Sequence, residues 1–282
     1  MPTRFDHAVI AVRDLETATR QFQHLGFDAQ PGGKHTGRGT HNSLIRFGLD
    51  YVELLSVYDE AEARAFNRNE PILLDSLHGK DAALVGYALA TTTIEQDAER
   101  FVGRGTIPPR PNPMQRRRPD GNLLTWRTLA PGDNSWDRPW PFLIQWDTPD
   151  EQRLLIDQPG TQPNGTTGWT QVAVATRKLE SALAVYRDQL GLELIEQSAQ
   201  HATLRVGKGT IELLAPEDNE LVQQILSEKG EGPFALTFTV KDLAQTRTFL
   251  EQRGIRFEQE AADTLSLAQN ETLGVRINLV NQ

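Results

Sequence analysis

The sequence contains no cysteine and no long apolar run. Without cysteine the chain forms no disulfides, no thiolate metal site and no cysteine nucleophile. No apolar stretch approaches the roughly 20 residues that a membrane-spanning helix needs, and residues 1–9 lead into a strand pattern rather than a secretion signal. We therefore expect a cytoplasmic protein with no membrane partner.

Basic charge is also scarce. The chain has 29 Lys and Arg against 38 Asp and Glu, a net charge of −9, which argues against binding a phosphate backbone. We predict no nucleic-acid partner. The one strongly basic cluster, MQRRRPDG at 114–121, is interpreted as a solvated loop. The oligomeric state stays open, with a homodimer among the arrangements considered.

A strand, a helix and three further strands form a pattern that recurs along the chain. It begins with FDHAVIAV at 5–12 and the helical segment DLETATRQFQHLGF, where Asp14 can cap the helix and Gly26 can stop it. Further copies begin near residues 83, 168 and 234. Aligning DLETA with KLESA sets YVELL (51–55) against TIELL (210–214), which indicates internal duplication.

These repeats predict an α+β fold of four βαβββ modules, paired into two domains with curved mixed sheets. The first domain is expected at 1–157 and the second, more divergent one at 168–282. The stretch between them, 158–167, is rich in Pro, Gly, Thr and Asn and is expected to be a linker.

Five motifs follow one another within residues 5–147: DHAVIAVRDLETA, PGGKHTGRGTHNSLIRFG, YVELL, RPDGNLLTWR and PWPFLIQW. In this order they resemble the glyoxalase-like domain family of the vicinal oxygen chelate superfamily. The superfamily includes glyoxalase I, extradiol dioxygenases and bleomycin-resistance proteins. The resemblance implies that paired modules enclose a cup, and that metal ligands project into it from the first and last strands of each module.

By that resemblance His7 and Glu53 match metal-ligand positions, and Gln145 is the candidate on the last strand of the paired module. Gly86 occupies the remaining position and offers no side chain. An imidazole, a carboxylate and an amide would suit a divalent ion such as Zn, Mn, Fe, Co or Ni. Glu53 is also the candidate catalytic proton carrier. The alternative is that His7 and Glu53 satisfy each other as a metal-free polar pair.

Four further residues are predicted to bind the substrate. His35, Thr40 and Asn42 belong to the glycine-rich stretch that begins at Gly32, whose backbone amides could form an anion-binding concavity. The alternative is a solvated hairpin in which the glycines only serve turns. Arg127 lies within an apolar strand: facing inward it would hold a carboxylate or phosphate, and facing outward it would be a surface residue.

The second half offers fewer ligands. Gln171 aligns with His7, and Glu212 with Glu53, but the fourth module offers Ala235 with Arg276 or Asn278. We interpret this half as structural or as a metal-free pocket for an anion.

For the whole protein we expect binding of a small anionic or oxygen-chelating molecule in the first cup. The chemistry would be that of a metal-dependent lyase, isomerase or dioxygenase. The alternative is a metal-free protein that binds or sequesters a small molecule.

Overall fold

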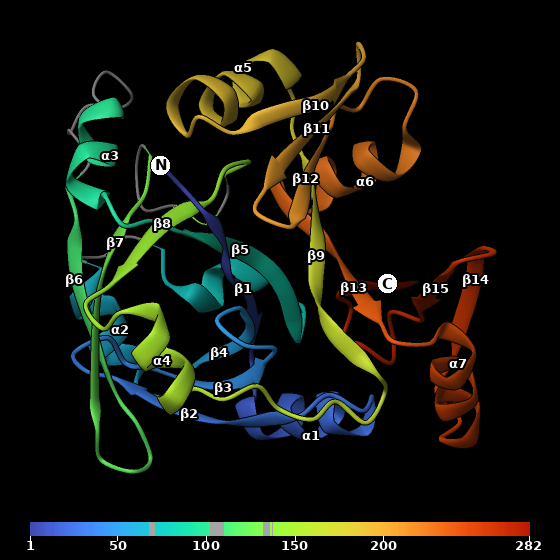
Figure 1. Ribbon diagram of the computed structural model, residues 1–282, viewed down its shortest axis with the longest axis horizontal. Coiled ribbons are helices and arrows are strands. Elements are labelled where there is room, and N and C mark those ends of the chain that lie inside the picture. The colour runs from blue at the N-terminus through green and yellow to red at the C-terminus, as the bar shows by residue number, and fades with distance from the viewer. Residues whose placement is uncertain (68–70, 102–109, 132–135, 137) are drawn as a thin grey trace.

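The computed structural model describes residues 1–67, 71–101, 110–131, 136 and 138–282. Each half of the chain builds one curved sheet, and the two sheets are joined through the long strand β9 (Figure 1). None of the helices in the described part is long and apolar enough to span a membrane.

In its described residues the first half contains two modules and three additional short helices. Module one comprises β1 (Arg4–Val12), α1 (Leu15–His24), β2 (Ala29–His35), β3 (Thr40–Arg46) and β4 (Tyr51–Val57). Module two comprises β5 (Ala82–Ala90), α3 (Ile94–Arg100), β6 (Asn112–Arg117), β7 (Leu123–Leu129) and β8 (Phe142–Trp146). The additional helices are α2 (Glu60–Phe66), the 3-10 helix η1 (Leu73–Leu77) and α4 (Asp150–Ile156).

The second half repeats this order. Module three comprises β9 (Thr166–Ala175), α5 (Leu179–Leu183), the π-helical turn η2 (Ala184–Gln189), β10 (Glu193–Gln197), β11 (His201–Val206) and β12 (Gly209–Leu214). Helix α6 (Glu220–Glu228) follows it. Module four comprises β13 (Gly232–Val240), α7 (Leu243–Gln252), β14 (Phe257–Ala261), β15 (Thr264–Leu267) and β16 (Arg276–Asn281).

The predicted α+β architecture of four βαβββ modules is confirmed. In each module the first and last strands are parallel neighbours, as in the pairs β1–β4 and β9–β12. The first strands of paired modules, β1 with β5 and β9 with β13, are antiparallel neighbours and join the two modules of each sheet. Helix α1 begins as predicted, because Asp14 accepts a hydrogen bond from the Thr17 backbone N–H at 2.7 Å.

The two sheets differ in closure. In the first, β2 pairs with β6, so that eight strands form a closed barrel. In the second, β10 and β14 stand at opposite ends of the strand order and leave the sheet open. Gly33 permits the closure: its φ is +134°, and an added Cβ would lie 2.1 Å from the carbonyl oxygen of Arg117.

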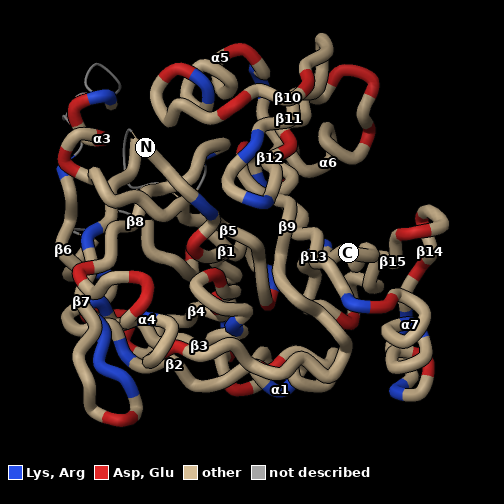
Figure 2. Tube along the Cα trace, viewed as in Figure 1, with Lys and Arg blue, Asp and Glu red and all other residues tan. Residues whose placement is uncertain are grey.

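Strands β2 and β6 correct two sequence interpretations. For the glycine-rich stretch from Gly32, the alternative of a hairpin whose glycines only serve turns is incomplete, because β2 extends to His35 and only residues 36–39 turn back into β3. The basic cluster at 114–121 was expected to be a solvated loop, but its first half is strand β6. Figure 2 shows basic residues continuing from the end of β6 into the hairpin before β7. The pairing of β2 with β6 forms the seam that closes the barrel. In both places backbone pairing across this seam outweighs the turn propensity of glycine and the solubility of arginine.

One hydrophobic core lies between the two halves. Phe5 and Trp169 bring their ring centroids to 4.1 Å, and the hydroxyls of Tyr87 and Tyr186 are hydrogen bonded. The expected linker is packed rather than free, because the buried amide of Asn164 donates to the Leu25 carbonyl at 3.1 Å. The domain boundaries at 1–157, 158–167 and 168–282 remain a prediction.

Candidate functional site

The inner face of the first barrel carries a buried polar network that begins on β1. The pairing of β1 with β5 shifts register between Phe5 and His7, and both Asp6 and His7 are buried there. An Asp6 carboxylate oxygen lies 2.9 Å from His7 Nδ1. The carboxylate also accepts hydrogen bonds from Trp146 Nε1 at 3.0 Å and from Arg4 at 3.1 Å.

Asp6 is a fixed negative charge. Burial alone would raise the pKa of its carboxyl, but the hydrogen bond with His7 and the charges of Arg153 and Arg4 lower that pKa to about 2. A charged carboxylate can only accept, so the proton of the neutral imidazole resides on Nδ1. The Nε2 atom of His7 is therefore its free basic nitrogen.

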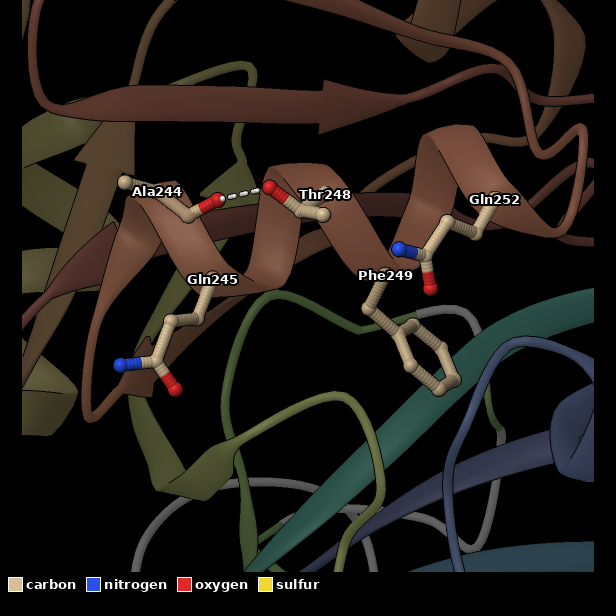
Figure 3. Close-up of a pocket in the computed structure, with 5 residues that line it drawn as sticks. All are labelled: Ala244, Gln245, Thr248, Phe249 and Gln252. Carbon is tan, nitrogen blue, oxygen red and sulfur yellow. Dashed lines mark hydrogen bonds between the residues drawn. The ribbon is translucent and has the colours of Figure 1, made fainter.

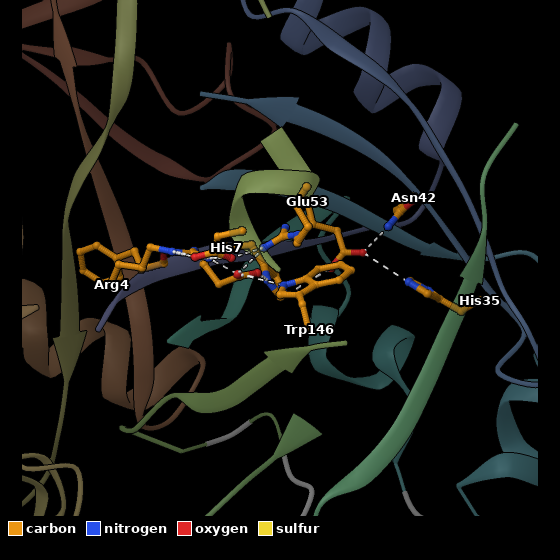
Figure 4. A network of polar contacts seen from close by, with 10 residues as sticks. Arg4, His7, His35, Asn42, Glu53 and Trp146 are labelled. Atoms are coloured by element: carbon orange, nitrogen blue, oxygen red, sulfur yellow. Dashed lines mark hydrogen bonds and ion pairs between the residues drawn. The ribbon is translucent and has the colours of Figure 1, made fainter. Parts of the chain in front are cut away.

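Glu53 lies beside His7 on the parallel strand β4. Its Oε2 is 3.8 Å from His7 Nε2, which is too long for a hydrogen bond. A small movement of either side chain would bring the two groups into contact for proton transfer. Its Oε1 accepts a hydrogen bond from the Asn42 side-chain amide and lies 3.8 Å from His35 Nε2 (Figure 4). The structure thus brings together four of the predicted residues: His7, Glu53, His35 and Asn42.

His35 presents its Nε2 to the same carboxylate from β2. Its Nδ1 lies 2.9 Å from Thr40 Oγ1, so the predicted residue Thr40 orients the imidazole. Burial is the largest cause that lowers the pKa of His35, to about 4; Glu53 opposes it, and Arg116 and Arg38 reinforce it. His35 is therefore neutral at neutral pH. The side chains of His7, His35 and Glu53 keep only 6–8% of their surface exposed.

Arg116 and Tyr51 join the site although neither was predicted. Arg116 is paired with His35 across the barrel seam and is 3% exposed. Tyr51 stacks on His7 with a centroid distance of 4.7 Å. Burial raises the Tyr51 pKa well above its ordinary value, so its hydroxyl stays protonated. Alternation was the available sequence signal, because Met114 and Arg116 share one face of β6.

Aromatic rings line the inner face beside this network. Trp126 and Trp146 lie with their centroids 4.9 Å apart, and Trp126 meets His35 edge to face at 5.9 Å. Phe142 meets His7 edge to face at 5.4 Å. The site therefore combines charged groups with a wall on which a flat or apolar ligand can pack.

Arg127 and Gln145 lie outside the barrel, contrary to the roles predicted for them. Arg127 donates to Glu95 at 2.9 Å on the side covered by α3. Gln145 pairs with Arg127 in register, and its amide oxygen accepts from the Ile94 backbone N–H at 2.9 Å. Both follow strand alternation, because the neighbouring Trp126 and Trp146 point inward. Neither residue reaches the candidate site.

The register also identifies the residue that replaces Gln145 in the ligand pattern. Val9, two residues after His7, pairs with Glu53. In the paired module Ala88, two residues after Gly86, pairs with Phe142. Phe142 is thus the counterpart of Glu53. At Gly86 an added Cβ would lie 2.8 Å from the Trp136 ring, so aromatic groups occupy both positions of the second module.

The second sheet carries a smaller polar set in the same register. Ala173, two residues after Gln171, pairs with Glu212, and Thr237 pairs with both Gln171 and Asn278. His201 Nε2 lies 3.1 Å from a Glu212 oxygen. The carboxylate is 30% exposed and the imidazole 26%, so this set faces water.

A surface groove of about 320 Å³ runs along α7 of the second half (Figure 3). Its lining residues are uncharged at neutral pH: Ala244, Gln245, Thr248, Phe249 and Gln252. It lacks the acid–base groups found in the first barrel, and we do not consider it the site of chemistry.

Comparison with known proteins agrees with this architecture. A family model described as glyoxalase-like domain matches residues 5–190. The chain belongs to the glyoxalase-like domain family. A second model, the glyoxalase, bleomycin resistance protein and dioxygenase superfamily, matches residues 168–269. No curated protein matches the sequence.

Solved structures share the fold of this glyoxalase-like protein. A hypothetical protein from Staphylococcus aureus has a TM-score of 0.73 at 15% identity, with 100% of both chains covered. A mutant 4-hydroxymandelate synthase from Streptomyces coelicolor has a TM-score of 0.65 at 16% identity, covering 99% of this chain and 92% of that one. A xylose isomerase-like TIM barrel/4-hydroxyphenylpyruvate dioxygenase fusion protein has a TM-score of 0.54 at 14% identity. The match covers 100% of this chain and 49% of that one.

Members of this superfamily often use divalent metals, but the donor set of the first barrel does not fit a metal centre of the expected pattern. Two of the four ligand positions are held by Gly86 and Phe142, neither of which can coordinate an ion. Glu53 faces His7 with one oxygen and His35 with the other. Within the described residues, no three histidine or carboxylate side chains are grouped as a metal site requires.

Proposed function

We propose that the first barrel binds a small oxygen-bearing molecule and transfers a proton on it, as an isomerase or lyase does, without a metal. The arrangement of Asp6, His7 and Glu53 carries this proposal. Asp6 fixes the tautomer of His7 and directs Nε2 toward Glu53, which supplies two proton carriers side by side in a site that is largely closed to water.

The chemistry follows from these positions. One of the two bases removes a proton from a carbon next to a carbonyl group. The electron pair of that C–H bond forms a C=C bond, and the π pair of the C=O bond moves to the oxygen to give an enolate. The side chains of Asn42 and Tyr51 are donors that can stabilise the resulting oxyanion. The proton then returns to the same or a neighbouring carbon, so the reaction needs no oxidant.

Deuterium exchange tests the proposal. Hydroxyacetone and pyruvate are incubated with the protein in D2O, and the loss of their protons next to the carbonyl is followed by NMR. We expect exchange above the buffer rate, and His7→Gln should slow it at least 100-fold, the usual scale for a general base. His201→Gln in the second sheet is the matched control and should leave the rate unchanged.

Metal dependence is tested with the same assay. Exchange should survive chelation and should not rise when Zn, Mn, Fe, Co or Ni is added. Activity that appears only with a metal, together with stoichiometric binding lost in Glu53→Gln, would contradict the metal-free proposal. It would instead assign His7, His35 and Glu53 to a metal site formed by rearrangement.

Binding without turnover is the second candidate function. The paired rings of Trp126 and Trp146 and the edge of Phe142 favour retention of an aromatic compound in the barrel. Quenching of tryptophan fluorescence by such a compound, with no exchange of any test substrate, would support a sequestering protein over an enzyme.

A further inference from the structure

Arg116 is a buried cation without a carboxylate partner. It lies on the inner face of the barrel and is 3% exposed. Its Nε has no hydrogen-bond partner, and its Nη1 makes only a long hydrogen bond to the Asn42 side-chain oxygen, at 3.4 Å, among the described residues. Within the described residues no Asp or Glu oxygen lies within ion-pair distance of it.

Three other arginines near the site, Arg46, Arg118 and Arg153, each have a carboxylate partner. Arg153 contacts Asp6 at 3.5 Å and Asp150 at 3.6 Å, although its Nε is also unpaired. Arg46 and Arg118 both pair with Asp157. A buried charge with no counterion is costly to a folded protein, so its retention calls for a partner that arrives with the ligand.

We propose that Arg116 anchors the carboxylate group of the ligand, which makes the substrate a small carboxylic acid. This inference rests on the proposed site in the first barrel. The Nε edge of a guanidinium and its adjacent amino group form a planar fork that matches a carboxylate with two parallel hydrogen bonds. In Arg116 the Nε of that edge is buried and has no hydrogen-bond partner in the described residues.

The surroundings favour an anion at this point. His35, its partner across the seam, is neutral at neutral pH and so sets no second cation against Arg116. The Tyr51 hydroxyl keeps its proton and has no hydrogen-bond partner in the described residues, so it is available as a further donor.

The separation of Arg116 from the proton carriers limits the size of the acid. A single amide group, that of Asn42, bridges Arg116 and Glu53, because its oxygen accepts from the arginine and its nitrogen donates to the carboxylate. A ligand with its carboxylate on Arg116 and its reacting carbon at His7 and Glu53 is therefore short. A 2-oxo or 2-hydroxy acid of a few carbons meets both requirements.

Calorimetric titration tests the anchor with pyruvate, formate and benzoate, and with pyruvamide as the neutral counterpart of pyruvate. We expect pyruvate to bind at least tenfold more tightly than pyruvamide. Arg116→Gln should weaken pyruvate binding about tenfold or more, the effect of losing a charge-assisted pair, and should leave pyruvamide unaffected. Arg117→Gln is the matched control, because Arg117 is the next residue of β6 and is exposed.

Urea unfolding of the same variants adds a readout that does not depend on a ligand. Removing an unpaired buried charge should raise the midpoint for Arg116→Gln relative to wild type, and Arg117→Gln should not change it. Arg116→Lys, which keeps the charge but loses the fork, should bind pyruvate with intermediate affinity.

The outcomes separate this inference from the proposed function. The carboxylate anchor at Arg116 is overturned if no carboxylate binds, if pyruvamide binds as well as pyruvate, or if the Arg116 and Arg117 variants bind pyruvate equally. Exchange of hydroxyacetone protons for deuterium would in that case still support the proposed proton transfer. Pyruvate bound through Arg116 but never exchanged would retain the anchor and reject the proton-transfer proposal.

Discussion

The two sheets place a carboxylate at the same register and surround it differently. Glu53 pairs with Val9, two residues after His7, and Glu212 pairs with Ala173, two residues after Gln171. In the first sheet the carboxylate side chain is 8% exposed, whereas in the second it is 30% exposed. Duplication therefore preserved the position of the group but not its environment.

Closure of the first sheet accounts for the difference. The rungs that join β2 to β6 include the pair His35 and Arg116, so the seam itself contributes two residues of the site. Strands β10 and β14 leave the second sheet without this pairing. Enclosure removes water, strengthens the interactions among charged groups and perturbs their pKa values, which is what proton transfer requires.

Replacing each carboxylate by its amide tests whether only the enclosed one is functional. Glu53→Gln should slow proton exchange by at least 100-fold, because the amide cannot take up a proton yet keeps an oxygen for Asn42. Glu212→Gln should leave exchange unchanged. NMR in D2O measures both, and equal losses in the two variants would mean that the open sheet participates in the reaction.

Disrupting the seam should convert the first sheet toward the open form of the second. Gly33→Ala would place a Cβ 2.1 Å from the Arg117 carbonyl oxygen, and it should lower the free energy of unfolding by about 3 kcal/mol more than Gly37→Ala does. Gly37 also has a positive φ, +70°, but nothing lies within 4 Å of its added Cβ. Urea denaturation of both variants gives the comparison. Equal losses would show that the seam contributes no stability.

The modules and the site residues of module one could be predicted from the sequence. The seam between β2 and β6 could not. The family resemblance implied that His7 and Glu53 lie on neighbouring strands, and it added weight to His35 and Asn42. Pairing between β2 and β6 joins residues about 80 positions apart, and no local pattern encodes it. Arg116 was consequently assigned to a solvated loop.

The error at Gln145 has a different origin. The short strand β8 offers few residues, and the polar one was chosen as the counterpart of Glu53 because carboxylates and amides are ligands. The register instead assigns that position to Phe142. Alternation alone cannot fix the face of a strand whose partners are unknown, and for the same reason the sequence leaves Arg127 open to either side.

The buried imidazole of His35 should make the closed sheet sensitive to acid. Its pKa is about 4 in the folded protein, lower than in the unfolded chain, so the unfolded state takes up a proton first as the pH falls. Its stabilising effect is complete above about pH 6.5 and is lost between there and pH 4. Over this pH interval the free energy of unfolding of the wild type should fall by about 2 kcal/mol more than that of His35→Gln.

Urea midpoints at pH 7, 5.5 and 4 measure this difference. His201→Gln is the matched control in the open sheet, because its imidazole is 26% exposed. The comparison of the two sheets would break down if the two histidine variants changed the acid sensitivity equally.

The smallest effect is expected at Asp50, where the first sheet meets the second. Its carboxylate lies against β9, and a Cβ added to Gly168 would be 3.7 Å from Oδ2. Burial raises the Asp50 pKa to about 6, although a hydrogen bond from its own backbone N–H and the charge of Arg4 oppose this. The folded state holds this proton more tightly than the unfolded state, so the charged form lowers stability above pH 6.

Asp50→Asn removes that penalty. It should raise the free energy of unfolding at pH 7.5 by about 1 kcal/mol, after allowance for solvent screening, and the gain should vanish as the pH falls through 6 toward 4. Asp81→Asn, at an exposed position outside this contact, should have no such pH-dependent effect. Urea midpoints at both pH values decide the matter. A gain that persists at pH 4 would mean that the amide stabilises the contact by packing, and that the boundary between the two sheets carries no electrostatic cost.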